Sequence, residues 1–472
     1  MKLFWRIAVL VSAVLAAACS PSVPAAQEKG PRPVTEPDYA DVLVPANIAP
    51  LNFFISDEAD AYVTVLGGTL VIKGREVRIP LARWRSLLAE NRGGAVSVAV
   101  YERHGGVWRA AEPYNIYVDD TGIDRYLTYR LIEPTYAMAG TMGIYQRDLT
   151  CFDEREVFNN TLDRDRSGGQ CINCHSFQNY DSETFQLHIR QKDGGTVIVR
   201  NGEIAKVNLK RDGFLSAGVY PAWHPTEPII AYSMNVTKQQ FPVGAYQKTE
   251  VFDSASDLVL YDVETDSLTV ISARPDLLET FPHWSPDGKS LYYSVAAADS
   301  AAGFENSRYD IYRASFDPVT RGFGPAEPVV DAAASGHSAL FPRVSPSGKY
   351  LLYTLTASGT FPIWHKDADL YLMDIASGES FPLEGANSRD TESYHSWSSD
   401  GKWIVFSSRR DDGLYTRFYF ARIGEDGVSS KPFVLPQKDP LAGRKSFKSF
   451  NIPEFTVNGT SLGPKAVLKA VK

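Results

Sequence analysis

A repeated turn-and-strand pattern in the second half constrains the fold of this chain more than any other sequence feature. The repeats begin 61, 60 and 53 residues apart and cover Trp223–Pro228, Trp284–Lys289, Val344–Lys349 and Trp397–Lys402. The second copy reads Trp-Ser-Pro-Asp-Gly-Lys, in which Pro presets φ, Asp bonds its own backbone and Gly takes a positive φ. An apolar strand follows each copy. One four-stranded unit cannot bury both of its faces alone, so the pattern predicts an all-β chain containing a β-propeller.

The repeats resemble those of the TolB-like, PD40-type β-propellers, and the resemblance covers roughly residues 215–430. It implies about six blades. Four blades are clear from the repeats, Phe185–Leu209 is expected to add another, and Phe450–Val457 is expected to help close the ring. The propeller is therefore assigned to residues 184–460.

Short alternating strands precede the propeller. Val96–Tyr101 alternates with a period of two, Tyr114–Val118 does so less cleanly, and Arg83–Asn91 has a helical pattern. Residues 51–134 are therefore expected to form a β-sandwich-like domain. Residues 135–183 are expected to form a loop segment between the two domains.

The N-terminus has the features of an export signal. Lys2 and Arg6 precede an apolar stretch from Ile7 to Ala18 that is too short to span a bilayer comfortably. Small residues before Cys19 resemble the bacterial lipobox, which implies a signal peptide over 1–18 and lipidation of Cys19; an ordinary secretory signal is the alternative. Ser20 after the cysteine favours the outer membrane by resemblance. Residues 19–50 contain seven prolines and predict an extended tether.

The charge of the chain argues against one class of partner. Lys and Arg number 48 against 56 Asp and Glu, a formal net charge of -8. A general nucleic-acid binder needs a basic face, so nucleic acid is not an expected partner.

The chemistry is concentrated in Cys171-Ile172-Asn173-Cys174-His175, which has the spacing of the covalent attachment motif of c-type haem. In that motif two thiols form thioethers with one porphyrin, and the adjacent histidine ligates the iron. The sequence therefore predicts one haem c held by Cys171 and Cys174, with His175 as the proximal iron ligand.

Three other uses of these cysteines are open. They are a Cys171–Cys174 disulfide, a thiol-redox pair, and a zinc site built from Cys151, Cys171, Cys174 and His188. If haem is bound, Cys151 is left over as a single thiol, which favours a buried packing role.

The second axial ligand is expected to be His188. If Phe185–Arg190 is a strand, His188 and Arg190 share the face opposite Phe185, Leu187 and Ile189. Arg190 would then contact a haem propionate. The rivals are Met142, Met138, Met234 and His224, the last of which replaces the serine of the other repeats.

The region 114–190 also resembles uncharacterised TolB-like lipoproteins that carry a haem motif. With the propeller as docking scaffold, the leading hypothesis is a non-catalytic electron-transfer protein. It would serve a redox partner protein in the periplasm or at the cell surface, anchored to the outer membrane by its lipid. The alternatives are a haem-dependent propeller oxidoreductase and a TolB-like interaction module with structural haem or zinc. A Gly-x-Ser-x-Gly pentapeptide at Gly459–Gly463 has no acid or histidine after it, so it is interpreted as a turn.

Overall fold

The computed structural model describes residues 22–133, 141–162, 169–241, 249–298 and 307–472. The chain divides into two compact units, one of residues 1–121 and 436–442 and the other of residues 122–435 and 443–472. The first division falls before residue 122, where the sequence analysis placed it after residue 134. No described helix is long and apolar enough to cross a membrane. Cys19 and Met138 lie outside the described residues.

Among its described residues, the first unit has the expected β-sandwich-like composition of two sheets, together with one helix. The seven-stranded sheet contains β1 (Glu28–Gly30), β3 (Leu43–Val44), β5 (Ala61–Leu66), β6 (Leu70–Lys73), β8 (Ala95–His104), β9 (Val107–Ala111) and β10 (Tyr114–Val118). The three-stranded sheet contains β2 (Thr35–Glu36), β4 (Phe53–Ile55) and β7 (Glu76–Val77). Helix α2 (Leu81–Glu90) buries Trp84, whose indole nitrogen donates to the carbonyl of Ile48 at 2.9 Å.

The expected tether over residues 19–50 is wrong for much of its length. Strand β1 pairs with β9 and β3 pairs with β10, both in parallel. The side chains of Tyr39, Val42 and Val44 are buried between the prolines. Their apolar area stabilises the packed arrangement, which an extended linker would leave exposed to water.

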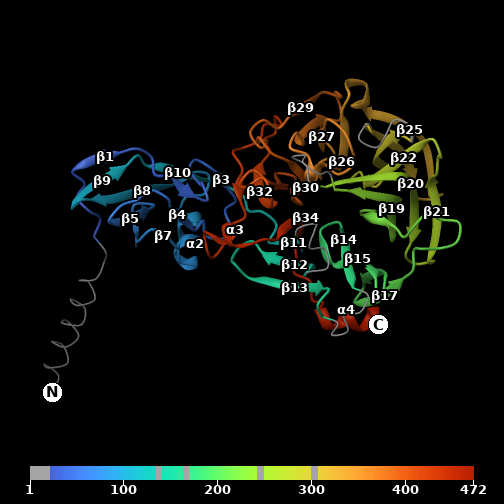
Figure 1. Cartoon of the computed structure of the whole chain (residues 1–472), viewed down its shortest axis with the longest axis horizontal. Coiled ribbons are helices and arrows are strands. Elements are labelled where there is room, and N and C mark those ends of the chain that lie inside the picture. The colour runs from blue at the N-terminus through green and yellow to red at the C-terminus, as the bar shows by residue number, and fades with distance from the viewer. Residues whose placement is uncertain (1–21, 134–140, 163–168, 242–248, 299–306) are drawn as a thin grey trace, which may run out of the picture. The chain divides into compact units, whose positions relative to one another are not determined.

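The second unit is a β-propeller of six four-stranded blades within the described residues, of which the second and third are joined by one parallel pair between Ser256 and Leu278. Figure 1 shows these sheets in teal to red, following the chain. Blade I contains β14 (Gln170–Gln178), β15 (Asp181–Gln191), β16 (Gly195–Arg200) and β17 (Glu203–Val207). Blade II contains β18 (Val219–Trp223), β19 (Ile229–Gln240), β20 (Glu250–Asp262) and β21 (Ser267–Ser272). Blade III contains β22 (Leu277–Trp284), β23 (Ser290–Ala297), β24 (Tyr309–Asp317) and β25 (Gly322–Val330). Blade IV contains β26 (Ser338–Val344), β27 (Tyr350–Thr356), β28 (Asp369–Asp374) and β29 (Ser380–Pro382). Blade V contains β30 (Glu392–Trp397), β31 (Trp403–Ser408), β32 (Arg417–Arg422) and β33 (Phe433–Val434).

Blade VI closes the ring with strands from distant parts of the chain. The C-terminal strand β34 (Ser449–Thr456) is its innermost strand, followed by β11 (Tyr126–Ile132), β12 (Gly143–Asp148) and β13 (Glu154–Asn159). The pairing of β34 with β11 is antiparallel and runs from Tyr126 opposite Thr456 to Ile132 opposite Ser449. Figure 1 shows red β34 beside teal β11. The propeller therefore begins before residue 135, whereas residues 184–460 were expected. Beyond β34, helix α4 (Pro464–Val471) buries Val467 and Val471 against blade I and blade VI.

The innermost strand of every blade contains the same irregularity. A residue with positive φ stands at a register shift in each, namely Cys174, Tyr220, Phe281, Phe341, Tyr394 and Ile452, with φ between 45° and 56°. Such β-bulges re-aim side chains at the inner end of a strand. Three residues further on stand the tryptophans of the repeat. Their indole nitrogens donate to a carbonyl of the preceding blade, Trp223 to Ser176, Trp284 to Ala222 and Trp397 to Arg343. The repeat thus carries the contacts that join one blade to the next.

Truncating Phe455 tests the role of β34 in closing the ring. Its side chain is 2 % exposed and lies 6.2 Å from the Phe420 ring centroid. Phe455→Ala is expected to lower the free energy of unfolding by about 3–5 kcal/mol, because a buried aromatic ring leaves a cavity. Val457→Ala, at a 54 % exposed position just after the strand, is the control and should change stability by about 0.5 kcal/mol or less. Equal thermal unfolding midpoints for the two variants would contradict the assigned role.

Candidate functional site

The propeller contains a cavity of about 1240 Å³. Its wall includes residues from the innermost strands of four blades: Cys171, Asn173 and Cys174 of β14, Tyr220 of β18, Tyr394 of β30, and Asn451 and Ile452 of β34. Ordinary small-molecule sites have volumes of about 300–1000 Å³. The cavity is therefore larger than most single-ligand pockets.

The Cys-x-x-Cys-His motif lies in this wall as a β-strand, so the expected haem-binding loop between two domains is wrong. Cys171 pairs with Arg190 across β14 and β15, and Asn173 pairs with His188. Cys174-His175-Ser176-Phe177 occupies the place of Phe281-Pro282-His283-Trp284 in blade III. Phe185–Leu209 was expected to add a blade, but its innermost strand, β14, was missed because no Ser-Pro-Asp-Gly-Lys turn follows it. The one feature that this strand shares with the repeats is an aromatic residue three positions after the bulge, Phe177 in place of Trp284.

Both motif cysteines line the cavity. They are not joined in a disulfide, and Cys174 is buried while Cys171 is partly exposed. Burial raises the pKa of the Cys174 thiol, and the nearby charges of Arg190 and Arg130 act in the opposite direction. The wall thus presents two thiols three residues apart to one space.

The imidazole of His175 does not line the cavity. It is 2 % exposed, and its ring lies 6.0 Å from that of Phe177. Burial, followed by the charge of Arg130, lowers its pKa to about 3, although the carbonyls of Thr128 and Ile452 lie close enough to oppose the shift. Neither ring nitrogen makes a hydrogen bond that meets ordinary distance and angle limits.

His395 is the structural equivalent of His175 in blade V. Its Nε2 donates to the carbonyl of Phe341 in the preceding blade at 2.8 Å. Burial lowers the pKa of His395 to about 3, so both imidazoles are neutral near pH 7. His395 joins two blades through a hydrogen bond of ordinary geometry, whereas neither ring nitrogen of His175 makes one.

Most of the expected second ligands are placed elsewhere in the propeller. His188 is buried, with Nδ1 3.0 Å from the hydroxyl of Thr196, and burial lowers its pKa to about 4. Met234 lies fully buried in a core cluster that blades I and II share. The Nε2 of His224 donates to the carbonyl of Gly288 at 3.0 Å. None of these three lines the cavity.

Met142 does line the cavity, and its sulfur accepts the backbone N–H of Ile172 at 3.4 Å. It is therefore the one named rival that the described residues bring to the motif. Arg190, the expected propionate contact, also lines the cavity.

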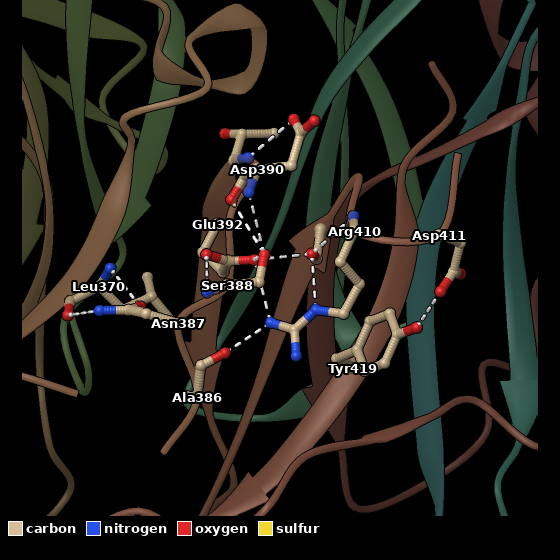
Figure 2. A network of polar contacts seen from close by, with 11 residues as sticks. Leu370, Ala386, Asn387, Ser388, Asp390, Glu392, Arg410, Asp411 and Tyr419 are labelled. Atoms are coloured by element: carbon tan, nitrogen blue, oxygen red, sulfur yellow. Dashed lines mark hydrogen bonds and ion pairs between the residues drawn. The ribbon is translucent and has the colours of Figure 1, made fainter. Parts of the chain in front are cut away.

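A buried polar network fixes the segment that carries another cation of the wall, Arg409. Figure 2 shows Ser388 and Arg410 around the carboxylate of Glu392, which is 0 % exposed. Glu392 accepts from the hydroxyl of Ser388 at 2.6 Å and from the Arg410 guanidinium at 2.9 Å. The backbone N–H of Arg409 donates to Thr391, and its guanidinium lies 4.3 Å over the ring of Trp364. Both Arg409 and Trp364 line the cavity.

The expected zinc alternative is excluded within the described residues. These residues contain no group of three or more His, Cys, Asp or Glu side chains that could hold a metal ion. The prediction of a zinc site built from cysteine and histidine side chains is therefore wrong. A haem iron takes only one or two protein ligands. The thiols, the cavity and the unsatisfied imidazole beside it are of the right chemistry for haem c, although His175 is not brought to the wall.

The chain matches no protein-family model and no curated protein sequence. Solved structures with a similar fold include an oligogalacturonate lyase from Vibrio parahaemolyticus, 13% identical, covering 61% of this chain and 84% of that one with a TM-score of 0.32. The tricorn protease is 13% identical, covering 74% of this chain and 34% of that one at 0.38. Prolyl oligopeptidase B from Galerina marginata is 12% identical, covering 71% and 41% at 0.37. The chain thus spans less than half the length of these two peptidases.

The six blades of the structure itself confirm the predicted all-β fold class with a β-propeller. The named structures are enzymes, and neither a TolB-like protein nor a cytochrome is among them. On this comparison the expected TolB-like relationship is wrong, and so is the expected non-catalytic electron-transfer role with the propeller as docking scaffold.

A carboxyl group behind the cavity wall gives the propeller a specific pH dependence. Asp253 is 2 % exposed and accepts from Asn235 at 2.5 Å and from Thr237, a wall residue, at 3.0 Å. Burial raises its pKa from 3.8 to about 6. Between about pH 4 and pH 6 the native state therefore holds a proton that the unfolded chain has lost, so this group lowers stability as the pH rises.

Asp253→Asn should remove this pH-dependent loss. The difference in the free energy of unfolding, variant minus wild type, should be about 2–3 kcal/mol larger at pH 7 than at pH 4, because only the wild type loses stability over this range. Denaturant unfolding at the two pH values measures the difference. Parallel pH profiles for the variant and the wild type would show that Asp253 does not titrate in this range.

Proposed function

We propose that the protein carries one haem c, attached through Cys171 and Cys174 in the propeller cavity, and that the cavity admits a small molecule beside it. The observation that carries the proposal is that both cysteines of a Cys-x-x-Cys-His motif line one large cavity. Bound haem supplies an iron that takes one or two axial protein ligands and can bind small molecules at an open position.

The rest of the wall supports this assignment. Tyr220, Tyr394, Phe361 and Trp364 give an aromatic surface suited to a flat apolar ring. The wall contains two acidic residues, Glu133 and Asp412, and more basic ones. The five basic residues are Arg130, Arg190, Lys192, Lys238 and Arg409. Haem propionates are anions, and a positive wall favours them.

His175 and Met142 are the proposed axial ligands. His175 follows Cys174 directly and has two buried nitrogens without hydrogen bonds. Met142 holds its sulfur against the backbone of the motif at Ile172. His188 is not favoured, since its imidazole is engaged with Thr196 inside blade I.

Export is part of the same proposal. Haem c is attached outside the cytoplasmic membrane, which agrees with the signal-like N-terminus and the lipidation proposed for Cys19. The anchor would keep the protein at the outer membrane.

Replacing the two cavity thiols tests haem attachment. Protein made in a host able to mature cytochromes c should give a haem c absorption spectrum, confirmed by a pyridine haemochrome. Cys171→Ala/Cys174→Ala should abolish the covalent haem, because both thioether bonds are lost. Cys151→Ala is the matched control and should retain it, since Cys151 is not in the wall. A wild-type protein without haem would overturn the proposal.

A matched pair of histidine variants tests the axial ligand. His175→Ala should shift the visible spectrum and open the iron to added imidazole. His395→Ala removes the equivalent side chain of blade V and should lower stability by about 1–3 kcal/mol with an unchanged spectrum, because it leaves the Phe341 carbonyl unpaired. Identical spectra for His175→Ala and the wild type would rule out ligation by His175.

A further inference from the structure

Arg130 is a buried cation in the cavity wall that the haem motif does not explain. It lies on β11 of blade VI, opposite Asn451 of β34, and is 8 % exposed. Its Nε makes no hydrogen bond, and within the described residues no carboxylate lies within 4.0 Å of its guanidinium. An arginine carries its charge at any ordinary pH.

A buried guanidinium without a counter-ion is unfavourable. Removing a charge from water costs several kcal/mol unless a partner and hydrogen bonds compensate. Another buried arginine of the propeller, Arg417, does have such partners, since its guanidinium donates to the backbone carbonyls of Lys448, Gly443 and Ser446. The partner of Arg130 is therefore expected to come from outside the chain, through the cavity that it faces.

The surroundings of Arg130 select an anion. Its positive charge acts to lower the pKa of Cys174 and of Tyr394, both of which line the same cavity. Asp412, one of the two acidic residues in the wall, does not pair with Arg130. Its carboxylate instead accepts hydrogen bonds from the backbone N–H groups of Leu414 and Tyr415 at 2.8 Å. A planar guanidinium with five donors matches a carboxylate through two parallel hydrogen bonds.

We propose that Arg130 binds a carboxylate of the molecule that occupies the cavity. That carboxylate belongs either to a haem propionate or to a separate small acid bound beside the haem. The choice between these sources rests on the proposed haem attachment, whereas the carboxylate site itself does not.

Titration calorimetry with succinate at constant ionic strength tests the site in two forms of the full-length protein. One is the haem-loaded wild type and the other is the haem-free Cys171→Ala/Cys174→Ala variant. Arg130→Gln in each form should weaken succinate binding at least tenfold wherever binding occurs, and Arg130→Lys should restore it in part. Arg125→Gln is the matched control, because Arg125 is an exposed arginine of the same blade paired with Asp148. It should bind succinate like its parent.

The two sources give different results. Binding to the haem-free form alone identifies a propionate as the resident partner, and binding to both forms identifies a separate acid. The proposal is overturned if succinate binds neither form, or binds Arg130→Gln as tightly as its parent. Should the wild type carry no haem, the proposed function fails while the same titration still decides the role of Arg130. Thermal unfolding of Arg130→Gln checks folding, and its midpoint should not fall, because the variant removes an uncompensated charge.

Discussion

The antiparallel pairing of β34 with β11 is the constraint on which the second unit depends. It joins residues more than 300 positions apart and completes blade VI, which covers apolar faces of blades I and V that would otherwise be exposed to water. The same strand contributes Asn451 and Ile452 to the cavity wall. The ring and its central cavity therefore form together, and the cavity is a consequence of closure.

Within the ring, the β-bulge of the innermost strands carries side chains of different chemistry in different blades. A bulge with positive φ recurs in all six innermost strands and turns the next residues toward the axis or toward the neighbouring blade. In blades II to V the bulged residue is aromatic, and four of these rings pack on one another, with Phe281 and Phe341 centroids 4.0 Å apart. In blade I the bulged residue is Cys174. The bulge position packs aromatic rings in blades II to V but carries a thiol in blade I. The next residue in blade I is His175, and its equivalent in blade V, His395, forms its hydrogen bonds with groups of a neighbouring blade.

The cavity concentrates positive charge in a chain that is negative overall. Field lines from a cationic concavity with low-dielectric walls attract anions even when the whole molecule repels them. The network around Glu392 contributes by holding the segment of Arg409 at the end of β31. Burial of Glu392 is tolerated because Arg410 and two hydroxyls satisfy its carboxylate.

The sequence by itself determined the propeller class, the repeat turns and the Cys-x-x-Cys-His motif, because tight turns and covalent attachment depend on neighbouring residues. It also indicated the Arg83–Asn91 helix, found as α2. Only the tertiary structure decided that the motif is an inner strand, that β11 to β13 belong to the propeller, and that Met142 and Arg130 reach the cavity while His188 does not. These facts depend on pairing between distant strands and on which face each strand turns to the axis. No local pattern encodes such pairings, since strand periodicity fixes alternation but not the partner.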